Sequence, residues 1–85
     1  MELIISPAVL KELGRIGVRD RNALIGKAEA FANDPFAHHL WAQTLKGQHN
    51  VVRIRQGDWR MVCRIDRETQ TVIADSVAHR KEIYR

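Results

Sequence analysis

The sequence predicts an α+β domain in which a small twisted antiparallel β-sheet carries an N-terminal helical hairpin on one face. Three observations predict this class. The chain has 85 residues, which is enough for one hydrophobic core but not for two. Apolar residues recur at helical spacing in the first half, and they alternate with a period of two from Val51 onward. We therefore expect residues 1–85 to form a single domain with the element order β-α-α-β-β-β.

The first half begins as a strand and continues as two helices. Residues 2–5 contain the β-type run Leu3-Ile4-Ile5, and the Ser6-Pro7 pair that follows is typical of a helix start. The first helix is expected from Pro7 to about Gly14. The second is expected from about Val18 to Ala32, because apolar residues share one face there and Asn33-Asp34-Pro35 ends the pattern.

The second half is predicted to be mostly β-structure. Residues 35–50 have no clear period, so we expect a connection with at most one helical turn. Three alternating segments then predict strands at Val51–Arg55, Trp59–Asp66 and Thr71–Ala78, followed by a tail from His79 to Arg85.

Composition excludes several classes of protein. Hydrophobic residues at 45% and charged residues at 28% are close to globular averages, which excludes a disordered chain. Apolar runs are far shorter than the roughly 20 residues of a membrane-spanning helix. The start MELIISPAV lacks the basic segment of a signal peptide, so a cytoplasmic location is expected. The one cysteine, Cys63, cannot form an internal disulfide.

Positive charge is concentrated in the second half. Residues 1–45 balance five basic against five acidic side chains, whereas residues 46–85 hold nine basic and five acidic ones. Arginine supplies most of this excess, and its planar guanidinium suits phosphate better than the ammonium of lysine does. A polyanion or an acidic protein is the partner that this charge predicts. The alternative is a solvated basic face without a partner.

The hairpin predicted around residue 57 brings basic side chains together. If Gln56-Gly57 is a two-residue turn, the strands before and after it pair directly. One face of the pair then carries mostly cations, and its facing pairs are Arg53 with Arg60, Arg55 with Asp58, and His49 with Arg64. The other face carries apolar residues that would pack on the helices.

Facing arginines predict a phosphate site. Like charges opposite each other destabilise a sheet by a few tenths to about 1 kcal/mol, and a phosphate held between the strands would remove that cost. The structural alternative is that an acidic side chain neutralises the pair. The candidates for that role are Asp58, Asp75 and Glu82.

Cleavage of an RNA phosphodiester is a chemistry that this face could support. It needs a base for the 2′-hydroxyl, stabilisation of the charged transition state and an acid for the leaving oxygen. Arginine supplies only the stabilisation, because its pKa is too high for it to act as a base. The candidates for proton transfer are His79, His49 and Tyr84. Each of them also has a purely structural interpretation.

Other signals are weak. His38 and His39 are adjacent and have no spaced third ligand, so a metal site is not expected. Cys63 falls on the apolar side of its strand and is expected to act as a small core residue. Nucleotide-binding and serine-hydrolase motifs are absent from the sequence, so no cofactor is expected.

The run LKGQHNVVRIRQGDWRMVCRID and the later VAHRKEIY resemble the RelE/ParE superfamily of toxins from type II toxin–antitoxin systems. The resemblance covers residues 45–84 well, and the first 44 residues agree in element order. It implies the RelE branch, whose members are ribosome-dependent endoribonucleases that cut mRNA in the A site without a metal. It also implies a cognate antitoxin that wraps the toxin, with an acidic segment expected over the basic face.

The resemblance also implies roles for individual residues. Arg60 matches the transition-state arginine of the family, and Arg80 matches a second phosphate-binding arginine. Tyr84 matches the tyrosine near the end of the chain, and Lys46 matches a basic residue that contacts RNA. We therefore expect catalytic roles for Arg53, Arg60, His79, Arg80 and Tyr84, and RNA contacts from Lys46, His49, Arg55 and Arg64.

One departure leaves other functions open. Relatives often carry lysines where this chain has Arg53 and Arg55, and one of those lysines is a proposed general base. Arginine preserves the charge but not the base, so His79 would have to compensate or cleavage would be slow. The alternatives are a ParE-like inhibitor of DNA gyrase and a degenerate toxin that only binds its antitoxin.

Overall fold

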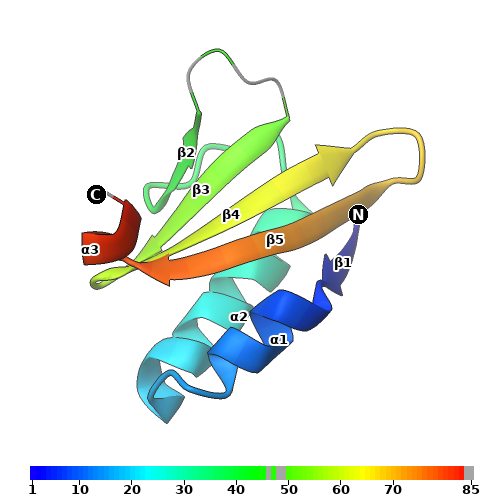
Figure 1. Cartoon of the computed structure of the whole chain (residues 1–85). Coiled ribbons are helices and arrows are strands. Elements are labelled where there is room, and N and C mark those ends of the chain that lie inside the picture. The colour runs from blue at the N-terminus through cyan, green and yellow to red at the C-terminus, as the bar shows by residue number, and fades with distance from the viewer. Residues whose placement is uncertain (46, 48–49, 84–85) are drawn as a thin grey trace.

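A five-stranded sheet with two helices packed on one face forms the body of the molecule in the computed structural model (Figure 1). The structure describes residues 1–45, 47 and 50–83. The helices are α1 (Pro7–Leu13), α2 (Val18–Asn33) and α3 (Arg80–Ile83). The strands are β1 (Glu2–Ile5), β2 (Ala42–Thr44), β3 (Val51–Gln56), β4 (Trp59–Asp66) and β5 (Thr71–His79). The predicted α+β class, with its N-terminal helical hairpin, is confirmed.

Local sequence explains how the helical hairpin begins. The side chain of Ser6 accepts a hydrogen bond from the backbone N–H of Val9 at 3.3 Å and caps α1. Pro7 occupies the first turn, where its missing N–H costs nothing. The short connection from α1 to α2 then folds the two helices back onto the same face of the sheet (Figure 1).

The strand order is β1-β5-β4-β3-β2, and one edge departs from the predicted antiparallel pairing. Strands β2 to β5 form an antiparallel meander, whereas β1 pairs in parallel with β5. The reason is topological: the two helices carry the chain from β1 across the sheet to β2, and three strands later β5 returns beside β1 in the same direction.

The segment before β3 also differs from the prediction. Residues 42–44 form a short edge strand paired with β3, where we expected an irregular connection. Three residues are too few to display a period of two in the sequence. At the other end, residues 80–83 of the predicted tail form the single turn α3, and His79 belongs to β5.

The hydrophobic core lies between the helices and one face of the sheet. Leu24 and Ala28 from α2 are fully buried against Ile54, Met61 and other residues of the central strands. The opposite face of β3 and β4 carries a row of arginines. We call it the arginine face and define it by Arg53, Arg55, Arg60 and Arg64.

Helices of membrane-spanning length and hydropathy do not occur in the described part of the chain.

Candidate functional site

The turn between β3 and β4 sets the register of the arginine face. The last pair before the turn is Gln56 with Trp59, so the two turn residues are Gly57 and Asp58. Gly57 has a backbone φ angle of +55°, a conformation that glycine adopts readily at the first position of such a loop. The predicted turn at Gln56-Gly57 was therefore wrong by one residue.

This shift changes the facing pairs but not the faces. Arg60 faces Arg55 rather than Arg53, and Arg53 faces Val62. Moving the turn by one residue moves every partner by two positions, so each side chain keeps its face. The predicted convergence of cations across the hairpin is therefore present, with Arg55 in place of Arg53.

Two other predicted pairs were also wrong. Arg55 does not face Asp58, which lies in the turn, and Arg64 faces Val51 rather than His49. His49 itself lies outside the described residues, as do Lys46 and Tyr84.

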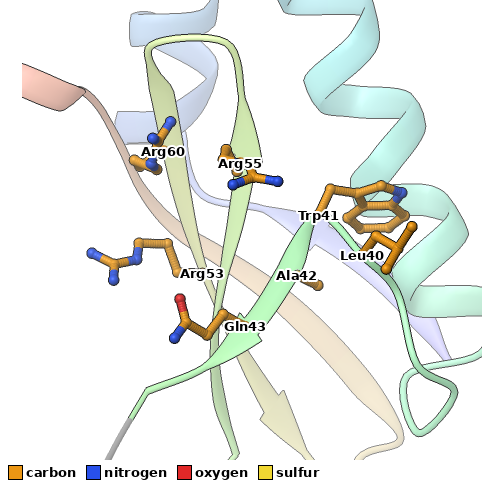
Figure 2. Close-up of a pocket in the computed structure, with 7 residues that line it drawn as sticks. All are labelled: Leu40, Trp41, Ala42, Gln43, Arg53, Arg55 and Arg60. Atoms are coloured by element: carbon orange, nitrogen blue, oxygen red, sulfur yellow. The ribbon is translucent and has the colours of Figure 1, made fainter.

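A pocket of about 140 Å³ opens on the arginine face beside the edge strand β2 (Figure 2). Arginines of β3 and β4 form one side, and the segment that leads into β2 forms the other. Its lining residues are Leu40, Trp41, Ala42, Gln43, Arg53, Arg55 and Arg60. None of these side chains is acidic, so the pocket concentrates positive charge and favours an anion.

Hydrogen bonds hold Arg60 in place at this pocket. Its guanidinium Nη1 donates to the carbonyl oxygen of Gly57 at 2.7 Å and to that of Trp59 at 2.8 Å. One acceptor lies in the turn and the other directly after it, at the start of β4, so the charge is oriented by the backbone before any ligand arrives. Preorganised cations of this kind are the groups that stabilise a developing negative charge most effectively.

Acidic side chains neutralise other cations of this surface. Arg64 Nε lies 3.1 Å from a carboxylate oxygen of Asp75, and Arg80 Nη1 lies 4.0 Å from one of Asp58. In contrast, no ion pair within residues 1–45, 47 and 50–83 includes an arginine that lines the pocket. Two of the three acids that could have neutralised the facing pair are thus engaged elsewhere.

A β-bulge moves His79 away from the pocket. The register between β4 and β5 shifts between Val62 and Cys63, and strict alternation beyond that point would have put His79 on the arginine face. The extra residue reverses the alternation, so His79 pairs with Trp59 on the helix side of the sheet. The two rings meet edge to face, with centroids 5.2 Å apart.

Both ring nitrogens of His79 have neighbours within the chain. Nδ1 accepts a hydrogen bond from the backbone N–H of Lys81 at 3.3 Å, and Nε2 lies 4.0 Å from a carboxylate oxygen of Asp58. His79 therefore remains next to Arg80 in the chain but does not line the pocket, an arrangement that alternation alone does not predict.

The apolar side of the pocket is held by contacts that the sequence did not reveal. The ring of His39 stacks on Trp41 with centroids 4.7 Å apart, and its Nε2 donates to the carbonyl oxygen of Asp34 at 2.9 Å. Lys27 reaches from α2 to within 5.9 Å of the Trp41 ring centroid and donates to the carbonyl oxygen of Arg55 at 2.8 Å. Burial, followed by the neighbouring charge of Arg55, lowers the pKa of Lys27.

A metal-binding cluster is not found among the described residues, where no three His, Cys, Asp or Glu side chains gather. Cys63 is buried in the core, and burial raises the pKa of its thiol to about 12. The arginine pocket is therefore the site with the clearest chemical character in the described structure.

Comparison with known proteins identifies the family. A family model described as the ParE toxin of type II toxin–antitoxin systems matches residues 3–84. The chain belongs to this toxin family. The resemblance to the RelE/ParE superfamily is thereby confirmed, and the partner of the toxin is an antitoxin protein. No curated protein matches the sequence.

Solved structures of RelE toxins have the same fold. RelE in the RelB–RelE complex from Methanococcus jannaschii is 26% identical, with a TM-score of 0.76 over 95% of this chain and 94% of that one. Isolated RelE from E. coli is 24% identical, with a TM-score of 0.80 over 98% and 89%. RelE in the complex with RelB from Pyrococcus horikoshii is 16% identical, with a TM-score of 0.79 over 93% of each chain.

Proposed function

We propose that this toxin is an mRNA endoribonuclease that acts on mRNA in the ribosomal A site and stops translation. The observation that carries the proposal is the pocket that Arg53, Arg55 and Arg60 line without an acidic neighbour in the lining. Repulsion within a cluster of cations lowers the stability of the fold when no acidic side chain offsets it. It is therefore best explained by a ligand that brings several phosphates.

The arrangement suits cleavage by the RNA's own 2′-hydroxyl. The 2′-oxygen attacks the adjacent phosphorus, the bond from phosphorus to the 5′-oxygen breaks, and the products are a 2′,3′-cyclic phosphate and a 5′-hydroxyl. Negative charge grows on the phosphate oxygens during this step. Arg60, held by two backbone carbonyls at the end of the hairpin, would stabilise that charge, while Arg53 and Arg55 would bind and orient the phosphate.

The remaining predicted residues are proposed to act around this pocket. Arg80, exposed at the start of α3, would contact a neighbouring phosphate. Tyr84 and Lys46 keep the roles that the resemblance implies, as the terminal tyrosine of the site and an RNA contact. Arg64, with Asp75 as its partner, would contribute less to RNA binding than the lining arginines do.

His79 is the residue for which the sequence predicted a role in proton transfer. Its position beside Trp59 favours a role in holding the end of β5 over a role as the base. We expect His79→Ala to lower the single-turnover rate by less than the 100-fold or more typical of a lost general base or acid, with an unchanged pH profile. Loss of the alkaline rise in rate would restore His79 as the base.

Inhibition of DNA gyrase is the second candidate, because the matching family model is that of ParE toxins. Primer extension on cellular mRNA after brief expression of the toxin separates the two functions. Cuts within translated frames support the ribonuclease. Intact transcripts together with inhibited supercoiling would reject it in favour of gyrase, and neither effect would leave a toxin that only binds its antitoxin.

The antitoxin is proposed to cover the arginine face with an acidic segment. Such a segment would relieve the same repulsion that the RNA phosphates relieve, so binding would inhibit the toxin directly. It would also stabilise the small domain by mass action. A toxin whose melting temperature is the same with and without the co-encoded antitoxin would contradict this mode of binding.

A further inference from the structure

We propose that Leu40, Trp41 and Gln43 form a nucleobase subsite beside the arginines, so that the toxin holds one base of a single-stranded RNA as well as its phosphates. The inference rests on the proposed function, because it takes RNA as the ligand. Contacts to phosphates cannot distinguish one base from another. A subsite at the edge strand β2 would add that preference.

Strand pairing puts these residues directly next to the arginines. Gln43 faces Arg53 across β2 and β3. Trp41 precedes β2, and its carbonyl oxygen accepts a hydrogen bond from the backbone N–H of Arg55 at 2.8 Å. Two pairs of residues therefore lie next to each other across β2 and β3 (Figure 2). One is Trp41 with Arg55, and the other is Gln43 with Arg53.

The wall formed by Leu40 and Trp41 is apolar, with Leu40 exposed and Trp41 half-buried against the core. Leu40 is 85% exposed, and both side chains line the same pocket as the arginines. The indole is held by the stacked ring of His39, so little side-chain freedom remains to be lost when a ligand packs against it. A flat base is a suitable partner for such a wall, because every base has an apolar face.

The size of the pocket indicates which part of a ligand it accepts. Its volume of about 140 Å³ is below the ~300 Å³ at which pockets begin to enclose a complete small molecule. It also opens on the exposed side of the sheet. The geometry therefore suits one nucleotide of a longer chain, whose next phosphate continues across the arginine face.

The combination of groups favours RNA over an acidic peptide. A nucleotide joins an anion and a flat ring within one unit, which matches guanidinium groups that lie next to an apolar wall. The exposed Gln43 amide offers both a donor and an acceptor, the pair of functions that a base edge requires. Acidic side chains would use the arginines but would leave this amide without a role.

Tryptophan fluorescence provides a direct test. The chain has two tryptophans, so the Trp59→Phe variant reports on Trp41 alone. The ligands are a short single-stranded RNA and the same RNA with one abasic position, titrated at matched ionic strength. We expect the intact RNA to quench Trp41 and to bind about tenfold more tightly than the abasic RNA.

Two further variants sharpen the test. Leu40→Ser and Gln43→Ala should each weaken binding of the intact RNA severalfold, with affinity for the abasic RNA unchanged. Leu10→Ser is the matched control, because Leu10 is also an exposed leucine (57%) but lies on α1, away from the pocket. It should bind both RNAs as the parent does.

Three results would overturn the subsite. Equal affinity for the two RNAs, without a change at Trp41, would reject base recognition while leaving phosphate recognition intact. Failure to bind either RNA would reject the subsite and the RNA-binding function together. Stronger quenching of Trp41 by a short acidic peptide than by RNA would assign the pocket to a protein partner instead.

Discussion

Arg60 and Met61 are consecutive residues of β4, yet they belong to different parts of the protein's chemistry. Met61 is fully buried between the sheet and the helices, whereas Arg60 lines the pocket on the opposite face. Alternation along one strand separates residues that determine stability from residues that determine function. We therefore expect that residues of one face can be changed without loss of the role of the other face.

The largest effect on stability is expected on the buried face. Met61→Ala should lower the free energy of unfolding by about 2–5 kcal/mol, because it removes buried methylene groups and leaves a cavity. Urea denaturation of the purified variant measures this loss. A loss below about 1 kcal/mol would mean that β4 is not packed on the helices as described.

The matched change on the open face should remove activity and leave stability nearly unchanged. Arg60→Ala should abolish growth arrest at equal expression, since one preorganised contact to the transition state contributes about 3 kcal/mol to the barrier. Its free energy of unfolding should stay within about 0.5 kcal/mol of the wild-type value. A variant that unfolds as readily as Met61→Ala would break the separation between the faces.

The buried face should also respond to alkaline pH. Burial, with a smaller contribution from the charge of Asp75, raises the pKa of Cys63 from 9.0 to about 12. The folded protein therefore keeps this proton after the unfolded chain has lost it. The stabilisation is complete below pH 9 and is lost as pH rises toward 12, by at most about 1.4 kcal/mol per pH unit.

Comparison with Cys63→Ala isolates this effect from the titration of other groups. Denaturation midpoints measured between pH 8 and 11 should fall more steeply for the wild type than for the variant. Parallel curves would show that the thiol is accessible in the folded state. Slow alkylation of the native protein by iodoacetamide is expected for the same reason.

The smallest effect is expected where an arginine of the open face has an acidic partner. The Arg64 and Asp75 side chains are both substantially exposed, and exposed pairs contribute about 0.2–1 kcal/mol. A double-mutant cycle with Arg64→Ala and Asp75→Ala measures the coupling. A coupling well above that range would make this pair a structural element rather than a solvated one.

Much of the fold could be predicted because its elements carry strong local signals. Ser6-Pro7 marks the start of α1, and the alternation from Val51 onward defines three strands with ends that differ from those observed by one residue or less. The parallel edge could not be predicted in this way. It depends on where the chain crosses the sheet, and no local pattern in residues 2–5 records that.

The placement of the arginines on one face of the hairpin was predicted correctly, and their register was predicted wrongly. Alternation correctly assigned Arg53 and Arg55 to one face, but both Gln56-Gly57 and Gly57-Asp58 are typical of turns. The preference for glycine at the first loop position would have favoured the observed one. Trp41 and Gln43 were missed because their strand exists only through pairing with β3.

The position of His79 illustrates a different limit. A bulge in β5 reverses the alternation before His79 is reached, and no glycine or proline in residues 71–79 marks it. The bulge is stabilised by the pairing of β5 with β4, so the pattern of residues within β5 alone cannot reveal it.

Single-turnover cleavage of mRNA on purified ribosomes tests the central claim most directly, with Arg60→Ala and Arg64→Ala compared at equal folded concentration. The two variants remove the same charge from the same face of β4, one from an arginine that lines the pocket and one from an arginine paired with Asp75. We predict a loss of about 100-fold or more for Arg60→Ala, a rate close to wild type for Arg64→Ala, and products ending in a 2′,3′-cyclic phosphate and a 5′-hydroxyl. Equal rates for the two variants, or intact mRNA with the wild-type toxin, would contradict the account.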